Sequence, residues 1–164
     1  MTDNAFHKQS FNSRMATAGD LAELACDKVY AYRTHKLGLD RVWQNGVGLY
    51  MAQMTPAMRY TPDRMVIDRF VECMGIGRDG TLKIKHEKIQ ALDQWANIGP
   101  TSLFVFDQTK NTYYEAPISE WVVALVEHAE TLSFPEGKLY YALHRSHFVG
   151  EAGVVPDVEA PTSI

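Results

Sequence analysis

Two acidic residues flank a short apolar segment in the sequence "PDRMVIDRFVECMG". Asp63 follows Pro62, and Glu72 lies nine residues further along. If residues 67 and 68 form the tip of a β-hairpin, Asp63 lies directly opposite Glu72, with Cβ atoms about 4.5–5.5 Å apart. Two carboxylates at that distance repel each other, and Mg²⁺ is commonly held by one or two carboxylates with waters. The spacing predicts a divalent metal site; the alternative is a hairpin whose polar face carries two unrelated acids.

The alternation of a β-strand places the neighbours of Glu72. Met74, two residues further on, is expected on the same face as Glu72, and Cys73 is expected on the opposite face, toward the core. The backbone carbonyl of Cys73 could still reach a metal ion bound by the two acids, so we include it among the candidate ligands.

The chain around this hairpin predicts a mixed α/β fold. Helical spacing of apolar residues predicts a helix over 14–37, ended by Gly38, and "NG" at 45–46 predicts a turn. After the hairpin we expect a helix over 82–98, a buried strand over 101–108, a second strand paired beside it over 110–118, and a helix over 118–132. This order predicts one central mixed sheet of about five strands, flanked by helices.

One domain accounts for the length of 164 residues. We expect it to span 14–148, with a flexible N-terminus at 1–13 and a flexible, proline-containing tail at 149–164. The segment "GKLYYALHRSHF" inside the domain fits a strand or a helix equally well.

Composition excludes several classes of protein. No apolar run is long enough to cross a bilayer, and the polar N-terminus lacks the apolar stretch of a secretory signal. The two cysteines are far apart and indicate no disulfide framework, so a reducing cytoplasm is expected. The net charge of −4 argues against a strongly basic, non-specific nucleic-acid binder. It leaves room for a local basic patch such as "GRDGTLKIKHEK".

The pattern of Pro62-Asp63, then Glu72-Cys73-Met74 on a strand, then helix, strand and helix resembles the PD-(D/E)XK nuclease superfamily. The resemblance covers about residues 14–130. It implies a restriction-endonuclease-like core with the element order αβββαβ. The chain also looks similar to small proteins of actinobacterial phages that carry "MRYTPD" and "GRD-TLK" stretches. This similarity implies that the protein acts in the cytoplasm of an infected bacterial host.

The resemblance implies metal-dependent hydrolysis of phosphodiester bonds. Asp63 and Glu72 would hold Mg²⁺ or Mn²⁺, and Glu23, on the first helix, matches a position where many members carry a further acidic ligand. The metal would lower the pKa of a bound water and stabilise charge on the phosphate.

Met74 stands where the family carries its lysine. A thioether has no proton chemistry at neutral pH and is a poor ligand for Mg²⁺. Three explanations stay open. The lysine has moved to Lys85 or Lys88, which would share one face of the following helix; the metal suffices alone; or the site no longer cuts.

The functional hypothesis is therefore a metal-dependent deoxyribonuclease, with a role in phage DNA recombination or processing. DNA is the expected partner, and Arg78, Lys83 and His86 are the candidate phosphate contacts. Nucleases that cut both strands are commonly homodimers, and the sequence leaves that state open. The alternative hypothesis is a catalytically inactive nuclease-fold protein that binds nucleic acid or acts as a structural or interaction module.

Overall fold

The computed structural model describes residues 11–39 and 54–162. The turn predicted at 45–46 lies outside these residues. The helices are α2 (Phe11–Val29), α4 (Pro56–Arg59), α5 (His86–Ala96) and α6 (Ile118–His128), with a 3-10 turn, η2 (Arg145–His147). The strands are β1 (His35–Lys36), β2 (Arg64–Val66), β3 (Arg69–Ile76), β4 (Thr81–Lys85), β5 (Thr101–Asp107), β6 (Thr112–Pro117), β7 (Glu130–Ser133), β8 (Leu139–His144) and β9 (Glu151–Val154).

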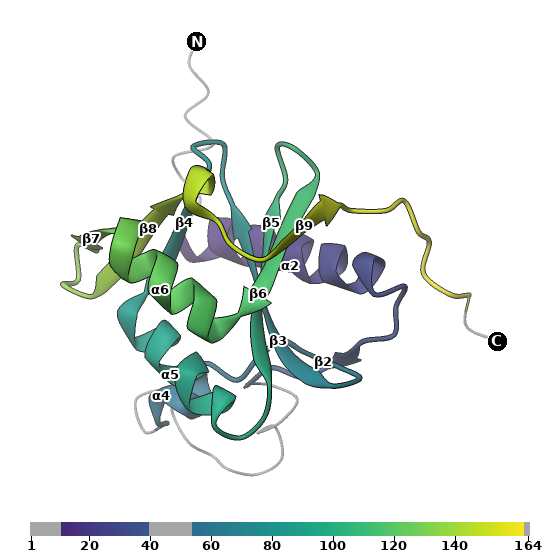
Figure 1. Ribbon diagram of the computed structural model, residues 1–164, viewed down its shortest axis with the longest axis horizontal. Coiled ribbons are helices and arrows are strands. Elements are labelled where there is room, and N and C mark those ends of the chain that lie inside the picture. Colours follow the sequence, from purple (N-terminus) through teal and green to yellow (C-terminus); the bar gives the residue numbers. More distant parts are fainter. Residues whose placement is uncertain (1–10, 40–53, 163–164) are drawn as a thin grey trace.

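The protein is a mixed α/β structure with two sheets (Figure 1). The larger sheet has the strand order β1-β2-β3-β5-β6-β9, in which β3 and β5 are parallel and the other neighbours are antiparallel. The smaller sheet, β4-β8-β7, is antiparallel throughout. The predicted mixed α/β class is therefore confirmed, whereas the larger sheet has six strands rather than about five and the second sheet was not expected.

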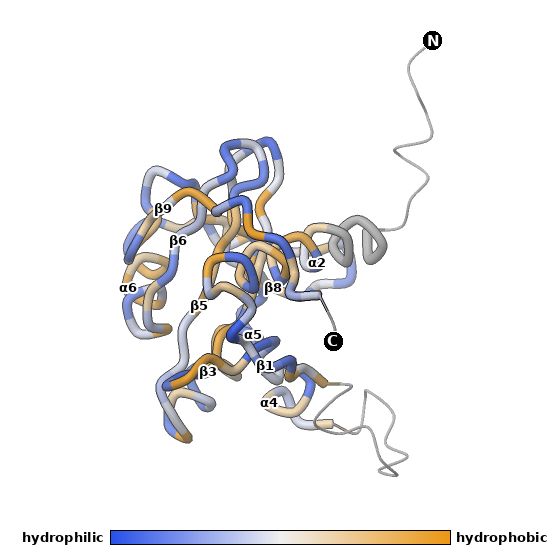
Figure 2. The backbone as a smooth tube through the Cα atoms, turned by 90° about the vertical axis from the view of Figure 1, so that its right-hand side faces the viewer, coloured by the Kyte–Doolittle hydropathy of each residue, from blue (hydrophilic) through white to orange (hydrophobic). Residues whose placement is uncertain are grey.

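Each face of the larger sheet buries its own hydrophobic cluster. Val71, Cys73 and Phe104 pack with α2 on one face. Met74 and Leu103 pack with α5, α6 and the small sheet on the other face. Successive side chains of a strand point to opposite faces, so β3 and β5, covered on both sides, contribute to both clusters. Figure 2 shows hydrophobic stretches in β3 and α2 and hydrophilic residues at several connecting turns.

The hairpin has the register that the sequence predicts. Arg64 pairs with Val71, Met65 with Phe70, and Val66 with Arg69, so residues 67 and 68 form the tip. Ile67 at the tip is 87% exposed. One further step in this register brings Asp63 opposite Glu72, which is the arrangement that the proposed acid pair requires.

The basic segment before α5 is a strand, and its prediction as helix is wrong. Leu82 and Ile84 are fully buried, whereas the alternate residue Lys83 is exposed. This alternation has the two-residue period of a half-buried strand. The helix begins only at His86, because Lys85 has the extended backbone of an N-cap. Lys85 and Lys88 therefore do not share a helix face.

Other boundaries also differ from the predictions. Helix α2 ends at Val29 rather than near residue 37, because Ala31 and Tyr32 take left-handed conformations with φ of 50° and 58°. Its first residues, 11–13, belong to the segment expected to be flexible. Helix α6 ends at His128, and residues 130–133 pair with β8 instead. Within the tail expected from residue 149, β9 pairs with β6.

Gly75 provides a test of how α2 packs on the sheet. A Cβ atom at Gly75 would lie 2.6 Å from the backbone oxygen of Ala18, which is closer than non-bonded atoms can approach. We expect Gly75→Ala to lower the free energy of unfolding by about 1–3 kcal/mol, because β3 and α2 would have to separate. Urea denaturation followed by circular dichroism measures this change.

Gly19→Ala is the matched control, because it adds the same methyl group next to Ala18. No described atom lies within 4 Å of a Cβ at Gly19, which is inside α2. Replacing a glycine inside a helix by alanine stabilises by roughly 0.5–1 kcal/mol. Equal effects of the two substitutions would contradict the close approach of α2 to β3.

Candidate active site

The centre of the candidate site is a buried ion pair between β3 and α5. Glu72 lies in the middle of β3 and is only 3% exposed. Lys88 lies in the first turn of α5, and its ammonium Nζ forms an ion pair with Oε1 of Glu72. The sequence had left Lys85 and Lys88 as alternatives, and the structure brings Lys88 to the acid pair.

Asp63 is fixed against the edge of β3. Its carboxylate Oδ2 accepts a hydrogen bond from the backbone N–H of Cys73, with an N–O distance of 2.9 Å. The N–H and C=O groups of one strand residue point to the same edge, so the Cys73 carbonyl also faces the Asp63 side of β3. This is the carbonyl that the sequence analysis names as a candidate ligand.

The charges at this centre interact strongly. Burial and the charge of Asp63 raise the pKa of the Glu72 carboxyl and Lys88 lowers it, with a net pKa of about 8. For Lys88, burial lowers the pKa of the ammonium, but the charges of Glu72 and Asp63 outweigh burial and the net pKa is raised. The pair therefore favours a charged lysine, and an additional cation near Asp63 would favour the ionised form of Glu72.

Glu23 lies close to the acid pair but on the other side of the hairpin. Its Oε2 forms an ion pair with Nη1 of Arg64 at 2.9 Å, and Arg64 also contacts both carboxylate oxygens of Asp27 at 2.8 and 3.1 Å. Burial raises the pKa of Glu23, and the charge of Asp63 raises it further. The charge of Asp63 thus acts on Glu23, whereas the direct ion-pair partner of Glu23 is Arg64 on β2.

Met74 has a structural position that explains its residue type. Its side chain belongs to the hydrophobic cluster formed with α5 and α6, and the residue is 7% exposed. A lysine at this position would bring an ammonium group into apolar surroundings, which is costly unless the charge is paired. The cation at Glu72 comes instead from α5.

The other predicted basic residues lie away from this ion pair. Lys85 is at the end of β4, and its ammonium lies 5.6 Å from the ring centroid of Phe134. Lys83 is exposed on β4 and forms an ion pair with Asp79 at 3.2 Å. Arg78 is exposed in the turn before β4.

His86 is the first residue of α5 and stacks on Tyr141, with ring centroids 3.9 Å apart. Its ring is therefore engaged with the small sheet rather than directed at the acid pair. Arg78, Lys83 and His86 nevertheless belong to one continuous stretch that leads from β3 into α5.

Sequence reasoning missed a polar cluster around Glu87, the neighbour of Lys88. The carboxylate of Glu87 accepts a hydrogen bond from Tyr60 Oη at 2.6 Å and contacts Lys138 Nζ at 3.0 Å and Arg59 Nη2 at 3.7 Å. The ring centroid of Tyr60 lies 5.9 Å from Lys88 Nζ. The cluster joins the segment before Asp63 to the start of α5 and the turn between β7 and β8.

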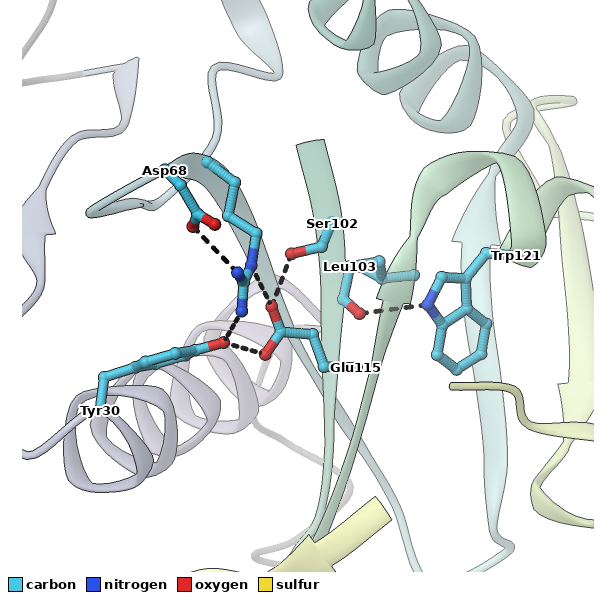
Figure 3. A network of polar contacts seen from close by, with 7 residues as sticks. Tyr30, Asp68, Ser102, Leu103, Glu115 and Trp121 are labelled. Carbon is cyan, nitrogen blue, oxygen red and sulfur yellow. Dashed lines mark hydrogen bonds and ion pairs between the residues drawn. The ribbon is translucent and has the colours of Figure 1, made fainter. Parts of the chain in front are cut away.

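A second polar network lies on the α2 face of the sheet (Figure 3). Arg69 Nε contacts Glu115 Oε1 at 3.0 Å, and Ser102 donates a hydrogen bond to the same oxygen at 2.7 Å. Tyr30 donates to the other carboxylate oxygen of Glu115. Asp68 also pairs with Arg69, at 2.9 Å. These groups satisfy one another and stabilise the sheet rather than complete the acid site.

The residues fit a cation held by two carboxylates. Asp63 and Glu72 supply hard oxygen ligands of the kind that Mg²⁺ and Mn²⁺ prefer, and a protein cation already lies against Glu72. In residues 11–39 and 54–162, no group of three or more His, Cys, Asp or Glu side chains could hold a metal ion. Glu23 is thus not part of a ready three-acid site.

Comparisons with known proteins add no relative: no family model, curated protein or solved structure matches this chain. Among its described helices, none has the length and apolar character required to cross a bilayer.

The raised pKa of Glu72 predicts a pH dependence of stability. With an ordinary pKa of 4.5 when unfolded and about 8 when folded, the native state binds more protons between these values. The unfolding free energy should therefore fall as pH rises through this window, with a slope of at most about 1.4 kcal/mol per pH unit for one proton. Glu72→Gln should remove this component, as measured by urea denaturation from pH 4 to 9 in the presence of EDTA.

Glu136→Gln, in the exposed turn between β7 and β8, makes the same chemical change away from the site. We expect this control to keep the wild-type slope. A Glu72→Gln variant with the same slope as the wild type would show that Glu72 does not bind the proton in question.

Proposed function

We propose that this protein is a metal-dependent nuclease that hydrolyses DNA phosphodiester bonds, with Lys88 replacing the lysine that the motif lacks at Met74. One observation carries the proposal: the ammonium of Lys88 lies against the Glu72 carboxylate, opposite Asp63. A catalytic group must be within hydrogen-bond reach of the reacting atoms, directly or through one water. Lys88 supports the proposal because its ammonium, from α5, is in direct contact with the proposed metal ligand Glu72.

The arrangement of elements supports the same proposal. Among the described elements between residues 11 and 107, α2, β2, β3, β4, α5 and β5 follow one another as helix, three strands, helix and strand, which is the order αβββαβ that the resemblance to PD-(D/E)XK nucleases implies. Two short elements, β1 and α4, are inserted between α2 and β2, and β4 belongs to the smaller sheet. The acids lie on the hairpin β2–β3, and the lysine comes from the helix that covers the same face of β3.

In this proposal Asp63 and Glu72 hold Mg²⁺ or Mn²⁺, with the Cys73 carbonyl as a further oxygen ligand. The bound metal supplies a water of lowered pKa and stabilises charge on the phosphate. Lys88 offsets the charge of the scissile phosphate and orients the attacking water. The positive charges of Arg78 and Lys83 lie before α5, where they would contact the DNA backbone outside the reacting group.

A second candidate is an inactive nuclease-fold protein that binds nucleic acid or a protein partner. It is favoured by the small number of acidic ligands, since Glu23 is held by Arg64 and the described residues contain no group of three or more potential metal ligands. In this second candidate, the ion pair of Lys88 with Glu72 stabilises the fold and no metal ion binds there.

Cleavage assays separate the two candidates. Purified protein is incubated with single-stranded, duplex and branched DNA in Mg²⁺, Mn²⁺ or EDTA. We expect metal-dependent cleavage that Asp63→Ala abolishes and that Lys88→Met reduces by about 10²–10⁴-fold, the usual contribution of a positioned proton-transfer group. Cleavage that Asp63→Ala leaves unchanged would refute the proposed site.

Lys85→Met is the comparison variant for Lys88→Met. Both substitutions remove one positive charge from the same stretch, but Lys85 lies near Phe134 and not at Glu72. A larger loss of activity in Lys85→Met than in Lys88→Met would reverse the assignment of the lysine. Absence of cleavage under all conditions, with retained DNA binding, would favour the inactive module.

A further inference from the structure

The starting point is the position of the Lys88 ammonium in the acid pair. It contacts Oε1 of Glu72, a carboxylate whose side chain is only 4% exposed. A divalent ion held by Glu72 and Asp63 would need the same oxygen atoms. Two cations within a few ångströms in a partly buried site repel each other strongly. Lys88 and a metal ion therefore cannot both make their best contacts with Glu72.

Tyr60 offers the ammonium a second position. Its ring centroid is 5.9 Å from Nζ of Lys88, within the distance at which an aromatic face attracts a cation. Lys88 has a flexible stem, so its ammonium can move between Glu72 and this ring without a change in the backbone of α5.

The Tyr60 ring is held in place by the cluster around Glu87. Its hydroxyl donates to Glu87 at 2.6 Å, and Lys138 and Arg59 hold the same carboxylate. Because Glu87 precedes Lys88 in α5, the ring and the lysine stem are anchored to one turn of helix. The Tyr60 ring therefore has a fixed position beside the flexible side chain of Lys88.

We propose that Lys88 is a tethered cation that occupies the metal position of the acid pair, and that Tyr60 is a positioning residue that receives its ammonium when a divalent ion binds. This inference rests on the proposed function, since it takes the metal site as given. It adds a competition between two cations for one site: the ammonium contacts Glu72 in the free protein and shifts toward the ring of Tyr60 in the metal-bound protein.

Metal affinity tests the competition without any measurement of cleavage. The dissociation constant for Mn²⁺ is measured by electron paramagnetic resonance of the free ion and by calorimetry. Lys88→Met should lower the dissociation constant at least about tenfold, because no ammonium must leave Glu72. Lys110→Met, in the exposed turn between β5 and β6, makes the same change of net charge and should keep the wild-type value.

Two substitutions at Tyr60 test the second position of the ammonium. Tyr60→Leu removes the aromatic face and should raise the dissociation constant about two- to fivefold, as expected for the loss of a partly exposed cation–π contact. Tyr60→Phe keeps the face and loses only the hydroxyl, so its dissociation constant should be closer to wild type than that of Tyr60→Leu. In Lys88→Met, the Tyr60→Leu change should have no further effect. Thermal unfolding in EDTA identifies any variant that fails to fold.

The outcomes separate this inference from the proposed function. Weaker Mn²⁺ binding in Lys88→Met, or equal affinities of the wild type, Lys88→Met and Tyr60→Leu, would overturn the competition while the metal site stands. Binding that Asp63→Ala does not weaken, or no binding by any folded variant, would overturn the metal site itself and the inference with it.

Discussion

The burial of Glu72 in the middle of β3 is the constraint on which the site depends. A carboxylate that is 3% exposed is costly in its ionised form unless a cation and hydrogen-bond donors compensate for lost water. Asp63, across the hairpin, increases this cost. Lys88 is the compensation that the chain provides, so the first turn of α5 must lie against β3. The change from strand to helix at Lys85 and His86 sets that position.

The same constraint explains why the lysine does not come from β3. Residues 72 and 74 point to one face of the strand, and on that face the space beyond Glu72 is filled by the hydrophobic cluster of α5 and α6. Met74 fills this space, whereas a lysine there would leave an ammonium without a partner. A lysine from α5 approaches Glu72 from the outside of the cluster, with its stem partly exposed.

The sequence predicts features that depend on residues close together in the chain, such as the pairing within a hairpin. The register of the hairpin follows once its tip is placed at residues 67 and 68, which is why the pairing of Arg64 with Val71 could be predicted. The choice between Lys85 and Lys88 could not be made, because it depends on where β4 ends. The charged residues of "TLKIK" alternate with buried Leu82 and Ile84, a signal that could have identified the strand.

Contacts between distant segments lay beyond this reasoning. The role of Arg64 is an example, because its acidic partners lie on α2, at least 37 residues earlier in the chain. The contact of Tyr60 with Glu87 spans 27 residues, and nothing in either local sequence indicates it. The partner of Glu23, Arg64, is likewise evident only from the packing of α2 on β2.

The acids on the two faces of the hairpin are paired with different kinds of cation. On the α2 face, Arg64 contacts both oxygens of Asp27 as well as Glu23, and such a two-pronged contact holds the strand in one orientation. On the α5 face, a single ammonium on a long stem contacts Glu72. A guanidinium with fixed geometry suits the side that sets the position of the acids, and a flexible ammonium suits the side where we propose that a charge moves. In that proposal the hairpin keeps Asp63 and Glu72 in register while the cation beside them changes.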